Sequence, residues 1–194
     1  MKKLSPTSFA PIFVTLFALA LSACGGGGSD SPAAGTVPAP AAPVATSGST
    51  CGISDFANAA LARMNALRAA GADCRTAGKF APAASLTWSA QLTQSSEAHT
   101  QDMVTHNFFS HTGSNGSTLS VRVDATGYQW NALGENIAAG QSGLDVVMTA
   151  WMGSDGHCAN LMNPAFKDVG LVCVPGTATT TYNIYWTMDL GASR

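Results

Sequence analysis

The sequence predicts an α+β fold with an antiparallel sheet. Segments with helical periodicity come first in the globular part, and two strand-like segments separated by a turn close it. Apolar residues make up 46% of the chain and charged residues 10%, which argues against general disorder. A length of 194 residues suits one ordinary domain.

Three helices are expected, over residues 54–70, over residues 89–105, and from residue 142 onward. Ser54 or Asp55 can cap the first and Gly71 can end it, while Ser142 with Asp145 resembles a capping box for the third. Each helix carries a stripe of residues at helical spacing. The stripes are Phe56, Ala60, Met64 and Leu67; Leu92, Ser96, His99 and Met103; and Leu144, Val147, Met148 and Trp151.

Two strands are expected, over residues 168–174 and 182–190, with a turn at Pro175–Gly176 after the first. Apolar and polar residues alternate in the second, which predicts a half-buried strand. The alternating apolar residues are Tyr182, Ile184, Trp186, Met188 and Leu190.

The N-terminus has the pattern of an export signal. Basic residues 2–3 precede an apolar run over residues 12–21, too short to span a bilayer. Residues 21–24, Leu-Ser-Ala-Cys, resemble the lipobox of bacterial lipoproteins, which implies cleavage of signal peptide 1–23 and acylation of Cys24. An ordinary secretory signal is the alternative. The prediction is an exported protein, lipid-anchored to the cell envelope, at the outer membrane if the organism is diderm.

A linker and one domain are expected after the signal. Residues 24–50 are nearly all Gly, Ala, Pro, Ser, Thr and Val, which is typical of a flexible linker, and residues 51–194 have a globular composition. Removing residues 1–23 removes two lysines and no acid, so 7 basic and 11 acidic side chains leave a net charge of −4. Nucleic acid is therefore not an expected partner.

Four cysteines remain in the predicted domain, an even number that favours disulfides in an exported protein. Three pairings are open. We expect the local one, Cys51 with Cys74 and Cys158 with Cys173, each closing a short loop. A catalytic thiol or a zinc–thiolate site is disfavoured, since no Cys-x-x-Cys occurs.

Three polar residues stand out as candidates for a site. Glu135 lies among glycine and apolar residues, where a carboxylate is expensive to bury unless it is paired. His111 and His157 are far from it in the sequence, so only the fold can bring the three together. His99 shares a face with Leu92 and is expected to be a hydrogen-bonded core residue, whereas His106 is expected to be exposed.

The combination of motifs resembles the CAP superfamily of cysteine-rich secretory, antigen 5 and pathogenesis-related 1 proteins, in its bacterial single-domain branch. The resemblance covers residues 54–191 and implies an α-β-α sandwich, with the antiparallel sheet between helical layers. Its elements, in order, are Trp88, Ala98-His99-Thr100-Gln101-Asp102-Met103, Phe109-Ser110-His111, Arg122, Gly127-Tyr128, Gly134-Glu135-Asn136-Ile137-Ala138, Trp151-Met152-Gly153-Ser154, Gly156-His157-Cys158-Ala159-Asn160-Leu161-Met162, Phe166, Val169-Gly170 and Tyr185-Trp186-Thr187.

The resemblance implies a cleft that contains His111, Glu135 and His157, with the two histidines able to bind zinc or another divalent metal. The family's second glutamate falls at Ser154 here, and its bacterial glutamine falls at Met188. Two neutral imidazoles plus solvent can still hold zinc, with Glu135 orienting a water or a histidine.

A non-catalytic binding module is the favoured function. Its expected ligand is an extracellular small molecule, lipid, glycan or protein. The main alternative is a metal-assisted hydrolase or peptidase in which Glu135 acts as general base. A nucleophile–base pair of Ser154 and His157 and a purely structural role are further alternatives.

Overall fold

The computed structural model describes residues 49–194. The predicted signal peptide, the predicted lipidation site at Cys24 and the linker up to residue 48 lie outside this range. Within residues 49–194, every helix is too short or too polar to cross a membrane.

Twelve elements make up the described part of the chain. The helices are α1 (Phe56–Ala70), α2 (Ala90–Thr105), α3 (Leu119–Ala125), α4 (Leu144–Met152), α5 (Asp155–Met162) and the 3-10 turn η2 (Arg75–Ala77). The strands are β1 (Ala72–Asp73), β2 (Lys79–Phe80), β3 (Thr87–Trp88), β4 (Trp130–Ala139), β5 (Asp168–Pro175) and β6 (Ile184–Ser193).

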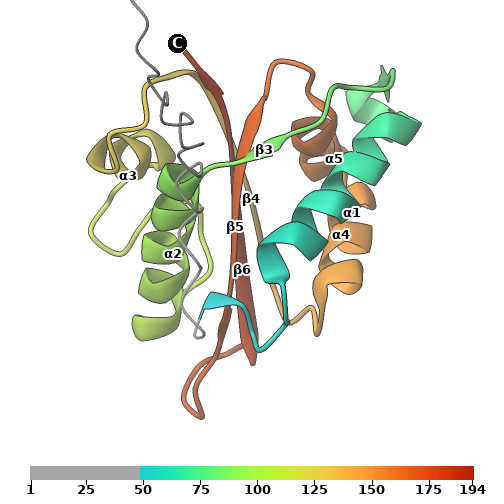
Figure 1. Ribbon diagram of the computed structural model, residues 1–194. Helices are drawn as coiled ribbons and strands as arrows, with labels where there is room; N and C mark the ends of the chain where they lie inside the picture. Colours follow the sequence, from blue (N-terminus) through green and yellow to red (C-terminus); the bar gives the residue numbers. More distant parts are fainter. Residues whose placement is uncertain (1–48) are drawn as a thin grey trace, which may run out of the picture. The chain divides into compact units, whose positions relative to one another are not determined.

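The fold is the predicted α-β-α sandwich. A four-stranded sheet runs in the order β3-β5-β6-β4, and α2 and α3 cover one face while α1, α4 and α5 cover the other (Figure 1). The pairs β4–β6 and β5–β6 are antiparallel, and only the two-residue β3 pairs in parallel, with β5.

Strand β6 is buried on both faces, so the prediction of a half-buried strand is wrong. Trp186, Met188 and Leu190 pack in the core formed with α1 and α4, whereas Tyr185 packs toward α2. Asp189 is fully buried as well. The polar residues of the alternation face a second helical layer rather than solvent, because the sheet is covered on both sides.

Helix α2 lies unusually close to the sheet. A Cβ atom on Gly170 of β5 would meet the backbone nitrogen of Thr93 at 2.1 Å, so only glycine allows this approach. The Ser96 hydroxyl donates to the Gly170 carbonyl, and the Thr100 hydroxyl donates to Thr187 on β6. This close packing fixes the polar residues of α2 against the central strands.

The predicted helices are present, with differences at their ends. Helix α2 begins after Ser89, close to the expected start, and the Ser89 side chain caps it by accepting a hydrogen bond from the backbone of Leu92. Helix α4 begins after Gly143, without a side-chain cap, so the Ser142 capping box does not form. The periodicity did not reveal α3, α5 or β4, because the two helices are short and β4 carries a glycine, a carboxylate and an amide in succession.

The disulfides link Cys51 with Cys173 and Cys74 with Cys158, so the expected local pairing is wrong. The fold explains the difference, since the backbone of Thr50 forms a bridge with Cys173 of β5. The closed loops span 122 and 84 residues. In the chain-entropy model such loops are worth about 4.5–5 kcal/mol each, against about 3 for a short loop.

Arg68 anchors α1 to the segment that follows α5. Its side chain is fully buried and donates to four backbone carbonyls, those of Ala84, Leu161, Asn163 and Phe166, at 2.7–3.2 Å. Burial lowers the pKa of its guanidinium. Removing it would leave several buried carbonyls without donors.

We therefore expect Arg68→Met to lower the free energy of unfolding by about 3–5 kcal/mol, measured by urea denaturation. Arg63→Met is the matched control on the same helix. Arg63 pairs with a largely exposed Asp145, so its loss should cost about 1 kcal/mol or less. Equal effects of the two substitutions would contradict the anchoring role of Arg68.

Candidate functional site

Glu135 is the centre of the candidate site. It lies on β4, its side chain is almost completely buried, and both carboxylate oxygens are engaged. Oε1 lies 2.7 Å from Nδ1 of His111, and Oε2 lies 2.5 Å from Nη2 of Arg122. The structure thus brings together two residues that sequence reasoning proposed for the site, His111 and Glu135, and adds Arg122.

Hydrogen bonds from two buried side chains, those of His99 and Arg122, hold the loop that carries His111. His99, fully buried on α2 as expected, donates from Nε2 to the carbonyl of Ser110 at 2.8 Å. Arg122 donates from Nη1 to the carbonyls of His111 and Ser117. The His111 side chain is nevertheless 58% exposed, so its ring combines a fixed Nδ1 with a solvent-facing edge.

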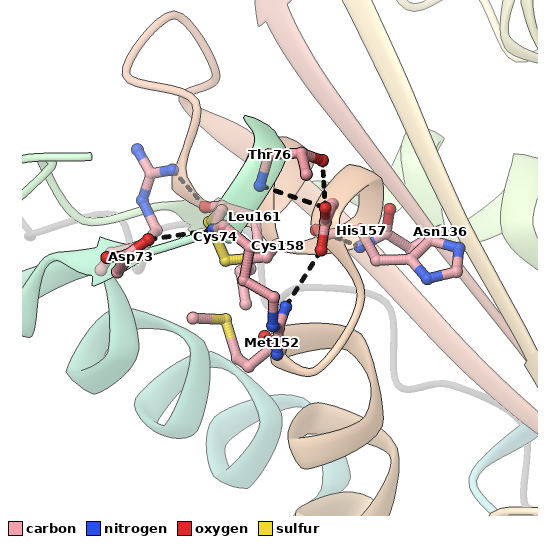
Figure 2. Close-up of a disulfide and its surroundings, with 11 residues drawn as sticks. Asp73, Cys74, Thr76, Asn136, Met152, His157, Cys158 and Leu161 are labelled. Atoms are coloured by element: carbon pink, nitrogen blue, oxygen red, sulfur yellow. Dashed lines mark hydrogen bonds and ion pairs between the residues drawn. A yellow bond between two sulfur atoms is a disulfide. The ribbon is translucent and has the colours of Figure 1, made fainter. Parts of the chain in front are cut away.

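His157 lies on α5, which is joined to β4 next to Glu135. Its carbonyl accepts a hydrogen bond from the Asn136 side chain, the residue after Glu135 on β4 (Figure 2). Asn160 donates to the Glu135 carbonyl and to the Asn136 side chain. The two asparagines therefore join α5 to β4, and the Cys74–Cys158 disulfide holds the next residue of α5 (Figure 2).

The contacts of Glu135 and His111 determine how these two groups ionise. Burial raises the pKa of Glu135, but the hydrogen bond from His111 and the charge of Arg122 outweigh burial, so the pKa lies below its usual value. Glu135 is therefore a carboxylate at neutral pH and accepts from His111 Nδ1–H. The hydrogen bond to Glu135 raises the pKa of His111 above 6.5, although burial opposes the shift.

Burial favours the neutral form of two further histidines, His157 and His99. Burial lowers the pKa of His157, and the positive charge of nearby His111 lowers it further. Burial also lowers the pKa of His99. A neutral imidazole is the form of histidine that can ligate a metal ion.

The position of the family's second glutamate offers no replacement carboxylate. Ser154 precedes α5, and its side chain makes no capping hydrogen bond. The neighbouring Asp155 is turned to η2, where it accepts from Thr76 and from Arg75. In the described range no three His, Cys, Asp or Glu side chains are arranged to hold a metal ion.

The residues present fit a two-histidine metal site with open positions. A ligating histidine typically donates its other ring N–H to a carboxylate, which is the arrangement of His111 with Glu135. The solvent-facing edge of His111 and the neutral ring of His157 would be the protein ligands. Water or a bound molecule would have to supply the rest.

Sequence reasoning missed the roles of two residues. Arg122 belongs to the quoted pattern, but nothing local shows that it meets Glu135, 13 residues away on another element. Asp189 appeared to face solvent in an alternating strand, yet it is buried opposite Glu135. Its only signal was a carboxylate between Met188 and Leu190 in an apolar strand.

Comparison with curated proteins shows partial similarity to two Bacillus subtilis proteins. The chain is 36% identical over 80 residues to the uncharacterized protein YkwD, covering 41% of this chain and 31% of YkwD. It is 27% identical over 88 residues to the uncharacterized membrane protein YlbC, covering 45% of this chain and 25% of YlbC. The matches thus span about a third or less of these relatives.

Solved structures show the same fold in proteins outside the cell or on its surface. An extracellular protein containing an SCP domain from Bacillus anthracis has a TM-score of 0.50 and 28% identity, over 57% of this chain and 35% of that one. An outer surface protein from Borrelia burgdorferi has a TM-score of 0.51 and 22% identity, over 58% of this chain and 80% of that one, which shows the fold alone.

The sequence model of the cysteine-rich secretory protein family matches residues 61–190, which include His111, Arg122, Glu135, His157 and all of α2 to β5. This match covers most of the chain. The protein therefore belongs to the cysteine-rich secretory protein (CAP) family.

Proposed function

We propose that this protein is an exported, lipid-anchored binding module whose cleft holds a divalent metal at His111 and His157 and takes a small molecule, lipid or glycan beside it. The observation that carries the proposal is the chain of contacts from Arg122 through Glu135 to His111. It fixes one imidazole at its Nδ1 and leaves the opposite edge of the ring to solvent. A bound metal would supply a Lewis-acidic centre for an oxygen or nitrogen atom of a ligand.

The same contacts favour binding over hydrolysis. A general base needs a free oxygen near the proton that it removes and a pKa close to the working pH. Glu135 has both oxygens engaged and a pKa below its usual value. The carboxylate therefore orients His111, and we assign it no proton-transfer role.

Several features support export. The N-terminal residues have the pattern of a lipoprotein signal, and the domain carries two disulfides, which persist in oxidising compartments. The similar Bacillus anthracis structure is of an extracellular protein. We propose acylation of Cys24, with residues 25–48 as the tether between the membrane and the domain.

We expect the oxidised protein to bind one zinc ion per chain in isothermal titration calorimetry, and His111→Ala or His157→Ala to abolish saturable binding. Each change removes one of two protein ligands. His106→Ala is the matched control, since His106 is exposed and pairs with Asp102 away from Glu135. Zinc binding that survives the loss of both His111 and His157 would contradict the proposed site.

The orienting role of Glu135 can be measured without metal. We expect the pKa of His111, followed by NMR in the metal-free protein, to lie above 6.5 and above that of His157. Glu135→Gln should lower the His111 pKa, because the carboxylate that stabilises the imidazolium is lost. The stabilisation that this ion pair gives the fold is present below pH 6.5 and disappears as the pH rises through the raised pKa. An unchanged His111 pKa in Glu135→Gln would refute the orienting role.

A further inference from the structure

Asp189 is a buried carboxyl group that the proposed site does not yet use. It lies on β6 directly opposite Glu135 of β4, as the register pairs these two residues. Its side chain has no exposure to solvent, and neither carboxyl oxygen makes a well-aligned hydrogen bond among the described residues, although Ser95 and Glu135 lie next to it. Buried oxygens in this state require an explanation.

The charges around Asp189 cannot balance two carboxylates. The groups that face it are Glu135 from β4, Arg122 from α3, and Ser95 from α2. His99 of α2 and His111 belong to the same cluster through Glu135. Arg122 is the permanent cation among them, and it already pairs with Glu135 and two carbonyls.

Two carboxylates side by side in a buried site cannot both stay ionised. Burial raises the pKa of Asp189 well above its ordinary value, and the negative charge of Glu135 raises it further. Arg122 and His111 both pair with Glu135, so Glu135 rather than Asp189 holds the negative charge. A proton on Asp189 also turns one unpartnered acceptor into a donor that faces Glu135.

We propose that Asp189 is a positioning residue that carries a proton at neutral pH and holds Glu135, as a carboxylate, in place against His111. The proposal deepens the proposed function, because His111 is one of its two metal ligands. The protonation involves groups on β4, β6, α2 and α3, and it can be read without any metal.

Glu135 and Asp189 have different roles in this arrangement. Arg122 and His111 take the two oxygens of Glu135 from the side of α3 and the loop, whereas Asp189 approaches from the neighbouring strand. A neutral donor there adds a contact to Glu135 without adding charge. An apolar residue would fill the space but donate nothing, and so could not substitute for it.

Infrared spectroscopy of the metal-free protein at neutral pH tests the protonation. We expect the carbonyl band of one buried protonated carboxylic acid, lost in Asp189→Asn and kept in Asp145→Asn, whose carboxylate is largely exposed. Absence of the band in the unsubstituted protein would overturn the proposal. Loss of the band in Glu135→Gln, with the band kept in Asp189→Asn, would also overturn it, because Glu135 would then hold the proton.

The positioning role is tested by the His111 titration in the same metal-free variants. Asp189→Asn remains neutral and can donate, so the raised His111 pKa should persist, whereas Asp189→Leu should shift it toward 6.5. Equal His111 pKa values in the two variants would show a merely space-filling residue. If the leucine variant fails to fold, a lowered His111 pKa in Asp189→Asn still overturns the proposal. A failure to bind zinc leaves these readouts unaffected, so the two proposals fail separately.

Discussion

The buried ion pair between Arg122 and Glu135 is the interaction on which the rest of the site depends. Burying two charges costs desolvation free energy. The attraction between the charges offsets this cost only when their remaining donors and acceptors are hydrogen-bonded. Here the remaining Glu135 oxygen accepts from His111, and Arg122 donates to the loop that carries His111. One pair thereby fixes the position of the loop, the orientation of the imidazole and the ionisation of the carboxylate.

The three-layer fold makes this pair possible. Because helices cover both faces of the sheet (Figure 1), Glu135 of β4 and Thr187 and Asp189 of β6 face α2 and α3 rather than water. The layer of α1, α4 and α5 on the opposite face is held by the hydrogen bonds of Arg68 and by the Cys74–Cys158 disulfide. This disulfide fixes α5 at the residue next to His157. The site thus has a solvent-exposed histidine, His111, on a buried and constrained base.

Much of this could be predicted from the sequence, and the failures have physical causes. Helical periodicity located α1, α2 and α4, and the family pattern singled out His111 and Glu135, which the structure brings into contact. The cysteine pairing failed because short loops are easy to close in the chain, whereas the fold brings Cys51 to β5. Asp189 was misread because alternation looks the same whether the second face meets water or a helix. The contact between Arg122 and Glu135 joins separate elements, which no local pattern encodes.

A double-mutant cycle on folding stability tests the central role of the pair most directly. Arg122→Met and Glu135→Met each leave a buried charge unpaired and should each lower the free energy of unfolding by about 3–5 kcal/mol. The double variant removes both charges, so its loss should be smaller than the sum by more than about 1 kcal/mol. Losses that add to within about 0.5 kcal/mol would show two independent residues and would contradict the account.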